Sequence, residues 1–523
     1  MTAATRALLL LILCLVLLAP GQAAGRVQAP APAAKYLVLI VMDGFRPDYM
    51  TLAPMHHVHA LMRTGTAYTR GWVGQLETET PTSHATLATG TYPREHHVVG
   101  FVWRNATGDN IIWTPSDYKQ VSAGDMESLI ESGGVPTISD QLHSTYRGSR
   151  SVSLSGEKFY AADAMGAGAD YILWGKAVGK NQDVIQTTAV PRHVPPRSSH
   201  LTAFKMPMGN DEPSSENFFA GRLAVHAAAL RPRMLLINLP GTDIEGHADG
   251  GVTDTADMRP VVKSADDAIG LVMKAYKKMG IFRQTLFIVT ADHGMIPNRH
   301  LARRDLVHQV VNASGILYLK QDLLSTAAYI YLRDPSNARQ MADDLVARHI
   351  PGMEGVFYKV STPGGLAFRP EPATAAALGP DLTQAYVDLS NTVAVTNGPE
   401  VIMPYAEDTV GINVKGEGPH WGTHGGLSWR VQHIPMVLSG PGIRHGVSSF
   451  PAQLVDVAPT IERLMGLVIP NRVDGVVLSD ALNHPTTTER TLQTAVTDER
   501  VRDVTALRAR SFAQHATILG KGQ

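Results

Sequence analysis

Apolar runs that end in acidic or glycine-rich turns recur along the chain. In the first, YLVLIVMDG at residues 36–44, seven apolar positions lead directly into Asp43. Runs of this kind are typical of strands that are buried on both faces, as in a parallel sheet. Similar runs follow at residues 233–243, 284–294 and 433–442. The pattern therefore predicts several buried strands of one central sheet.

Helical periodicity separates these runs. In the clearest case the apolar positions alternate in steps of three and four residues, and they are Val262, Ala265, Ile269, Val272, Tyr276 and Met279. Such spacing places the apolar side chains on one helix face. A second amphipathic helix is expected in QLVDVAPTIERLMG, residues 453–466. The alternation predicts an α/β fold in which helices cover both faces of a central, mostly parallel sheet.

The segment 297–419 has a different pattern. It contains the strand-like sequences AAYIYL and GVFYKV, and between them Asp334-Pro335, a pair typical of a helix start. We expect a smaller α+β insertion that shapes the site. The chain then divides into a signal peptide (1–23), a leader (24–34), a first core part (35–296), the insertion (297–419), a second core part (420–485) and a C-terminal tail (486–523).

The N-terminus has the features of a secretory signal. Arg6 precedes an apolar run at residues 7–18, and small residues follow up to a cleavage point expected after Ala23 or Ala24. The run is shorter than the roughly 20 apolar residues that span a bilayer. We therefore expect a secreted or periplasmic protein without stable membrane insertion. Cys14, the only cysteine, lies inside this signal, so the mature chain is expected to contain no disulfide.

Composition excludes one class of partner. The 523 residues are 44% hydrophobic and 18% charged, as in ordinary globular proteins, and their formal net charge is -1. Because such a chain has no basic surface field, binding of a nucleic-acid polymer is not expected.

Acidic and imidazole side chains gather where the predicted strands end. They are Asp43, Asp243, His247, Asp292, His293 and His424. Ligands of open α/β sheets bind at the carboxyl ends of the strands, and the four-residue spacing of Asp243 and His247 lets both side chains reach one point. Asp and His together are ligands typical of zinc. The sequence therefore predicts a metal site at this edge of the sheet.

Candidate nucleophiles lie in ETETPTSHATLATGTYP, residues 77–93, near a predicted helix start. A threonine hydroxyl needs a base or a metal to become a nucleophile. Some of these hydroxyls are expected only to cap the helix.

The motifs, taken in order, carry a resemblance. They are MDG, TETPTSHATLATGTYP, DIEGH, TADHGM and GTHGG, followed by SGPGIRHG, QLVDVAPTIERLMG and VDG. Together they resemble the alkaline phosphatase superfamily, and most closely its type I phosphodiesterase/nucleotide pyrophosphatase branch, over nearly the whole mature chain. The resemblance implies a hydrolase of small-molecule phosphoesters with two divalent metal ions. The Asp and His ligands favour zinc, with manganese or mixed sites as the alternative.

The resemblance also implies roles for single residues. Thr80 matches the family's nucleophile, which forms a covalent phospho-threonine; Thr82 is the alternative, because Pro81 lies one place early. One metal is expected at Asp43, Thr80, Asp292 and His293, and the other at Asp243, His247 and His424, with His420 as a less favoured ligand.

Two departures from the family pattern bear on the substrate. Phe101 stands where many relatives have an asparagine that donates to a phosphoryl oxygen, so either Asn105 or the backbone substitutes, or the substrate differs. Lys158 is the only basic residue kept from a triplet that marks monoesterases and phosphonate hydrolases, and it is either a phosphate contact or a surface lysine. A site with few cations favours a singly charged diester. Trp103 and Trp113 either stack on a leaving group or belong to the core.

We therefore expect an exported two-metal phosphodiesterase or nucleotide pyrophosphatase that acts through Thr80. The alternatives are a phosphomonoesterase or phosphonate hydrolase and, in a different class, a non-catalytic metal-binding scaffold. A sulfatase is excluded, because the mature chain has no cysteine and no segment in which Cys or Ser is followed by x-Pro-Ser-Arg.

Overall fold

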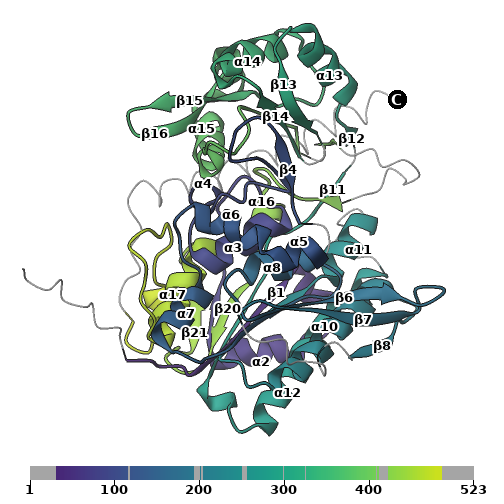
Figure 1. The fold of residues 1–523 in the computed structure, drawn as a ribbon, viewed down its shortest axis with the longest axis vertical. Helices are drawn as coiled ribbons and strands as arrows, with labels where there is room; N and C mark the ends of the chain where they lie inside the picture. Colours follow the sequence, from purple (N-terminus) through teal and green to yellow (C-terminus); the bar gives the residue numbers. More distant parts are fainter. Residues whose placement is uncertain are drawn as a thin grey trace, which may run out of the picture.

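The computed structural model describes residues 31–115, 118–193, 201, 204–249, 256–298, 300–323, 326–407, 409–411 and 422–485. The predicted signal peptide, residues 24–30, His420 and the predicted tail lie outside these ranges. Figure 1 shows a larger body built on one long sheet and a smaller body above it. None of the helices in the described part is long and apolar enough to cross a membrane.

A ten-stranded sheet forms the larger body, in the order β21-β2-β20-β10-β1-β9-β5-β6-β7-β8. Its strands are β1 (Tyr36–Met42), β2 (Thr66–Tyr68), β5 (Ser151–Leu154), β6 (Tyr171–Val178), β7 (Val184–Pro191), β8 (Lys205–Pro207), β9 (Met234–Leu239), β10 (Thr285–Thr290), β20 (Met436–Ser439) and β21 (Gly446–Ser448). β1 runs parallel between β9 and β10, so that Leu39 lies beside Leu236 and Ile288. Every residue of these three strands is buried, which explains their largely apolar sequences.

One predicted strand differs from its neighbours in direction. β20, in the apolar run 433–442, is antiparallel to both β10 and β2. A strand covered on both faces needs apolar side chains whichever way it runs, so its sequence does not reveal its direction.

Helices cover both faces of the large sheet (Figure 1). On one face lie α2 (His56–Thr64), α10 (Glu212–Ala228) and α12 (Met258–Lys278); on the other lie α3 (Thr80–Thr89), α7 (Ile138–Thr145), α8 (Phe159–Met165) and α17 (Val457–Met465). α12 is the helix predicted at 262–279. The helix predicted at 453–466 begins with a 3-10 turn, η5 (Leu454–Asp456), and continues as α17. The predicted α/β fold with helices on both faces is thus confirmed.

The smaller body is a five-stranded antiparallel sheet with helices, built from residues inside the segment 297–419. The strands, in spatial order, are β13 (Tyr318–Asp322), β14 (Ala327–Leu332), β17 (Val401–Pro404), β15 (Phe357–Thr362) and β16 (Gly365–Pro370). The helices are α13 (Arg304–Ala313), α14 (Ala338–Ala347) and α15 (Pro372–Ser390). The Asp334 side chain accepts from the Ser336 N–H at 2.9 Å, but the turn it starts is the 3-10 segment η3 (Pro335–Asn337), which leads into α14.

Short elements connect the two bodies. β11 (Ile296–Pro297) pairs with β19 (Gly422–Thr423), and β12 (His300–Leu301) pairs with β18 (Thr409–Val410). A hairpin of β3 (Val102–Arg104) and β4 (Ile111–Trp113) reaches up from the core; the buried Arg104 guanidinium pairs with Glu400, and the Tyr331 hydroxyl donates to the Val102 carbonyl at 3.0 Å. The remaining elements are η1 (Pro47–Thr51), α4 (Pro93–His96), α5 (Tyr118–Ala123), α6 (Asp125–Ser132), α11 (Gly241–Asp249), η2 (Phe282–Gln284), η4 (Asn391–Val393), α16 (Trp429–Gln432) and η6 (Ser479–Ala481).

Candidate active site

The parallel register of β1, β9 and β10 brings the predicted ligands together at one end of the sheet. Asp43 follows β1 directly, Asp243 lies in the first turn of α11 after β9, and Asp292 and His293 follow β10. His424 follows β19, on the return from the insertion. These side chains are all buried.

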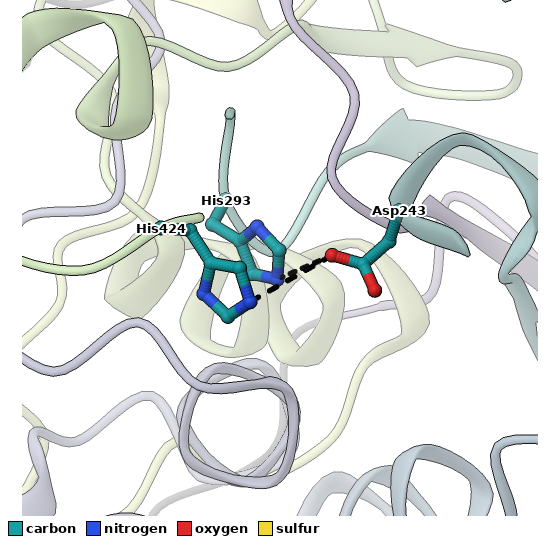
Figure 2. Close-up of side chains that lie close together, drawn as sticks. All are labelled: Asp243, His293 and His424. Carbon is teal, nitrogen blue, oxygen red and sulfur yellow. Dashed lines mark ion pairs between the residues drawn. The ribbon is translucent and has the colours of Figure 1, made fainter. Parts of the chain in front are cut away.

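Figure 2 shows three of these residues, Asp243, His293 and His424. The two imidazole rings are stacked, with centroids 3.6 Å apart and planes 12° apart, and each turns Nε2 toward Asp243 Oδ1 at 3.7 Å. His247 Nε2 lies 3.4 Å from the same oxygen, and its Nδ1 lies 2.8 Å from the Gly422 carbonyl oxygen. Three imidazoles therefore face one carboxylate oxygen.

A second group contains Asp43 and Asp292, and His293 lies between the two groups. Its Nε2 is 3.5 Å from Asp43 Oδ1 and 3.4 Å from Asp292 Oδ2. The other oxygen of Asp292 accepts from the backbone N–H groups of Gly44 at 3.1 Å and His293 at 3.0 Å. These bonds hold the Asp292 carboxylate so that Oδ2 faces the cluster.

Unsatisfied polar atoms test whether the cluster fits a cation. Asp243 Oδ1, Asp292 Oδ2 and His293 Nε2 are sealed from solvent and form no hydrogen bond within the described chain. Buried atoms of this kind are costly unless a partner satisfies them. Burial and the charge of Asp43 raise the pKa of Asp292 well above its usual value, and burial lowers the pKa of both His293 and His424. Neutral imidazoles beside crowded carboxylates are suited to binding divalent cations.

Two residues that the sequence did not assign support this cluster. The Asn238 amide donates to Asp43 Oδ2 at 2.8 Å and to His84 Nε2 at 3.0 Å, and its own oxygen accepts from Ser155. His84 Nδ1 then donates to the Thr80 carbonyl at 2.7 Å, and burial lowers the pKa of His84 to about 4. Although His84 lies near Asp43 and Asp292, both its nitrogens are engaged, so it orients its neighbours. A single polar residue in the buried run MLLINL was the available signal for Asn238.

Thr80 is the first residue of α3 and is buried, directly after Glu79 at the N-cap. Its hydroxyl forms no hydrogen bond among the described residues. Thr82, two positions along the helix, has its hydroxyl oxygen sealed from solvent and likewise without a partner in the described chain. The start of α3 thus presents two hydroxyls at a helix N-terminus, the end of a helix at which anions bind.

The two predicted substrate contacts lie in different surroundings. Lys158 is buried, donates to Asp43 Oδ1 at 3.0 Å and also pairs with Asp243, so it is not a surface lysine. Burial lowers its pKa, but the two carboxylates outweigh burial, so the pKa lies well above its usual value and the ammonium stays charged. Asn105 lies instead in the exposed turn of the β3–β4 hairpin, and the structure does not bring it into contact with the cluster.

The model of the type I phosphodiesterase/nucleotide pyrophosphatase family matches residues 37–384, a range that includes Asp43, Thr80, Asp243 and Asp292. The chain belongs to this family. As a member, it is a metal-dependent phosphoester hydrolase of the alkaline phosphatase superfamily.

Two curated relatives and one solved structure show how far the similarity reaches. Ectonucleotide pyrophosphatase/phosphodiesterase 1 of Saccharomyces cerevisiae is 24% identical over 328 residues, 59% of this chain but only 40% of that protein. Alkaline phosphatase PhoK of Sphingomonas sp is 23% identical over 519 residues, 85% of this chain and 91% of PhoK. The crystal structure of wild-type alkaline phosphatase PafA is 15% identical with a TM-score of 0.63, and the match covers 87% of this chain and 100% of PafA. At this identity PafA shows a shared fold.

The sequence left open whether Trp103 and Trp113 stack on a leaving group or belong to the core. In the structure the two side chains have different environments. Trp103 is 4% exposed and packs among α3, α6 and α8, whereas Trp113 is 50% exposed, with Lys320 Nζ 4.5 Å from its ring centroid. Both line a cavity of about 640 Å³ between the β3–β4 hairpin, α6 and residues 396–397. The lining of this cavity contains neither Thr80 nor a residue of the Asp/His cluster, so it is separate from the cluster.

Proposed function

We propose that the chain is an exported two-metal phosphodiesterase or nucleotide pyrophosphatase that uses Thr80 as a covalent nucleophile. The observation that carries the proposal is the buried convergence of Asp43, Asp243, Asp292, His293 and His424, in a chain whose match to the family extends over Thr80. One ion is assigned to Asp43, Thr80, Asp292 and His293, and the other to Asp243, His247 and His424. The Asp and His donors favour zinc.

In the first step Thr80 Oγ1 gives its proton to solvent water and attacks phosphorus in line with the leaving oxygen. The Oγ1–P bond forms, the P–O bond to the leaving group breaks, and the leaving alkoxide takes a proton from solvent water. Water then attacks the phospho-threonine, which releases the phosphate product and restores the hydroxyl. Bound divalent ions supply the Lewis acidity that lowers the pKa of the nucleophile and neutralises phosphoryl charge. Backbone N–H groups at the start of α3 and the Lys158 ammonium orient phosphoryl oxygens. Asn105, the other contact expected from the sequence, is left out of this proposal because its amide bonds within its own exposed turn.

A preference for diesters is supported by the scarcity of cations beside the nucleophile. Lys158 already faces two carboxylates, and Phe101 supplies no polar group. Such a site neutralises less negative charge than a doubly charged monoester needs. The second candidate is a phosphomonoesterase, which is favoured by the similarity to alkaline phosphatase PhoK over 91% of that protein.

The two functions are separated by one pair of substrates. The chain without residues 1–23 is loaded with zinc, and kcat/KM is compared for methyl p-nitrophenyl phosphate and p-nitrophenyl phosphate. We expect the diester to be cleaved faster; faster monoester cleavage would establish the second candidate. Failure to cleave either ester or a nucleotide would leave the metal-binding scaffold as the better description.

The nucleophile is tested with a matched pair of variants. Thr80→Ala is expected to lower kcat by about 10³-fold or more, because the covalent step is lost. Thr82→Ala, two positions along the same helix, serves as the control and is expected to stay within about tenfold of the parent. Activity that survives Thr80→Ala but not Thr82→Ala would move the nucleophile to Thr82.

A further inference from the structure

The phosphate-binding side of the site lacks the donor that an asparagine at position 101 would supply. The Phe101 ring has no donor, and its backbone N–H is already given to Glu79 Oε2 at 2.6 Å. The Asn105 amide donates to Thr107 Oγ1 at 2.7 Å and Asp109 Oδ1 at 3.0 Å within its own exposed turn. Both substitutes considered from the sequence are therefore engaged elsewhere.

Phe101 touches the side chain of Tyr160. The two rings meet edge to face, with centroids 5.1 Å apart and planes 80° apart. Tyr160 is the second residue of α8 and stands two positions after Lys158, whose ammonium lies among the carboxylates. The start of α8 thus places the phenol beside the position where the asparagine would lie.

The Tyr160 hydroxyl is free to donate. It forms no hydrogen bond among the described residues, although the side chain is only partly exposed. Burial raises the pKa of this phenol, so the hydroxyl keeps its proton at neutral pH. A buried or half-buried tyrosine hydroxyl normally finds a partner, and a protonated phenol can satisfy a phosphoryl oxygen.

We infer that Tyr160 donates a hydrogen bond to a non-bridging phosphoryl oxygen of the substrate and so replaces the contact that is missing at Phe101. The inference rests on the proposed function, since it concerns the same phosphoester site. Phe101 becomes a positioning residue, because its ring edge holds the phenol. An uncharged donor adds no positive charge, which agrees with a singly charged diester as substrate.

The test is Tyr160→Phe, which removes only the hydroxyl. In the zinc-loaded chain we expect kcat/KM for methyl p-nitrophenyl phosphate to fall about 10- to 100-fold, mainly through kcat, because the bond strengthens as charge develops on the phosphoryl oxygens. Tyr118→Phe is the control. Tyr118 is 51% exposed, and its ring centroid lies 6.5 Å from that of Trp174, so its hydroxyl is not expected to affect turnover. Phe101→Asn in the Tyr160→Phe background is expected to recover at least half of the loss on a logarithmic scale, because the amide restores a donor.

A second readout separates this inference from the proposed function. The affinity of the zinc-loaded chain for inorganic phosphate, measured by calorimetry, is expected to weaken about 5- to 10-fold in Tyr160→Phe. If the parent chain hydrolyses no phosphoester but Tyr160→Phe still weakens phosphate binding, the proposed function fails and the Tyr160 contact stands. If the parent is active and Tyr160→Phe stays within twofold in both turnover and phosphate affinity, the inference is overturned. A loss of turnover matched by an equal loss in Tyr118→Phe also overturns it.

Discussion

Glu462 provides a test of the folded state that does not involve the active site. It lies on α17, which packs against the large sheet, and its side chain is 1% exposed. Oε2 is sealed from solvent and has no hydrogen bond within the described chain. Burial alone raises the pKa of this carboxyl to about 9. Glu462 therefore keeps its proton in the folded protein at neutral pH and loses it on unfolding.

The magnitude follows from linkage between folding and proton binding. The raised pKa of Glu462 lowers the free energy of unfolding as the pH rises. This penalty is small below the unfolded pKa near 4.5 and grows with pH until about 9. Each pH unit in that window costs about 1.4 kcal/mol, so the penalty increases by about 3 kcal/mol between pH 5 and pH 7.5 at most. Glutamine has nearly the same shape as glutamate and does not titrate. The free energy of unfolding of Glu462→Gln should therefore gain up to this amount over that of the parent between pH 5 and pH 7.5.

The assay is the midpoint of thermal unfolding of both chains at pH 5 and pH 7.5, with a chelator present throughout so that metal binding does not differ. We expect Glu462→Gln to unfold at a higher temperature at pH 7.5 and to lose most of this advantage at pH 5. Glu131→Gln, at an exposed carboxylate on α6, is the control and should show no such trend. An advantage of Glu462→Gln that is equal at both pH values would refute the reasoning.

Three further predictions concern the cluster. Removal of metal with a chelator should abolish phosphoester hydrolysis and lower the unfolding midpoint, and zinc should restore both, because the cation stabilises the state that binds it. Asn238→Ala removes the amide that holds Asp43 and His84, so zinc affinity measured by chelator competition should fall about 10- to 100-fold while the far-UV spectrum is retained. Gly44 has a φ of +67°, and an added Cβ would lie 2.8 Å from Asp243 Cα. Gly44→Ala should therefore lower the free energy of unfolding, measured with denaturant, by about 2 kcal/mol or more, and should also lower kcat/KM. A loss below about 0.5 kcal/mol would contradict the close approach.

Sequence reasoning succeeded where the relevant property is local. β1, β9 and β10 are apolar because they are buried on both faces, so their existence follows from hydrophobicity alone. Asp and His keep their ligand chemistry wherever they lie, and their place at strand ends follows from the same pattern. These properties sufficed to predict the fold class and the neighbourhood of Asp43, Asp243 and Asp292, whereas the family followed from the resemblance of the ordered motifs.

Tertiary structure decided which side chains meet. The antiparallel direction of β20, the bonds of Asn238 to Asp43 and His84, and the burial of Lys158 among carboxylates all depend on register and on packing between distant segments. The contact of Phe101 with Tyr160 is of the same kind, because it joins the loop between α4 and β3 to the start of α8. Composition and periodicity describe how each segment is buried, whereas contacts between segments depend on the three-dimensional packing of the whole core. The motifs of the chain alone thus indicated the reaction class, and only the folded chain brought the Tyr160 phenol against Phe101.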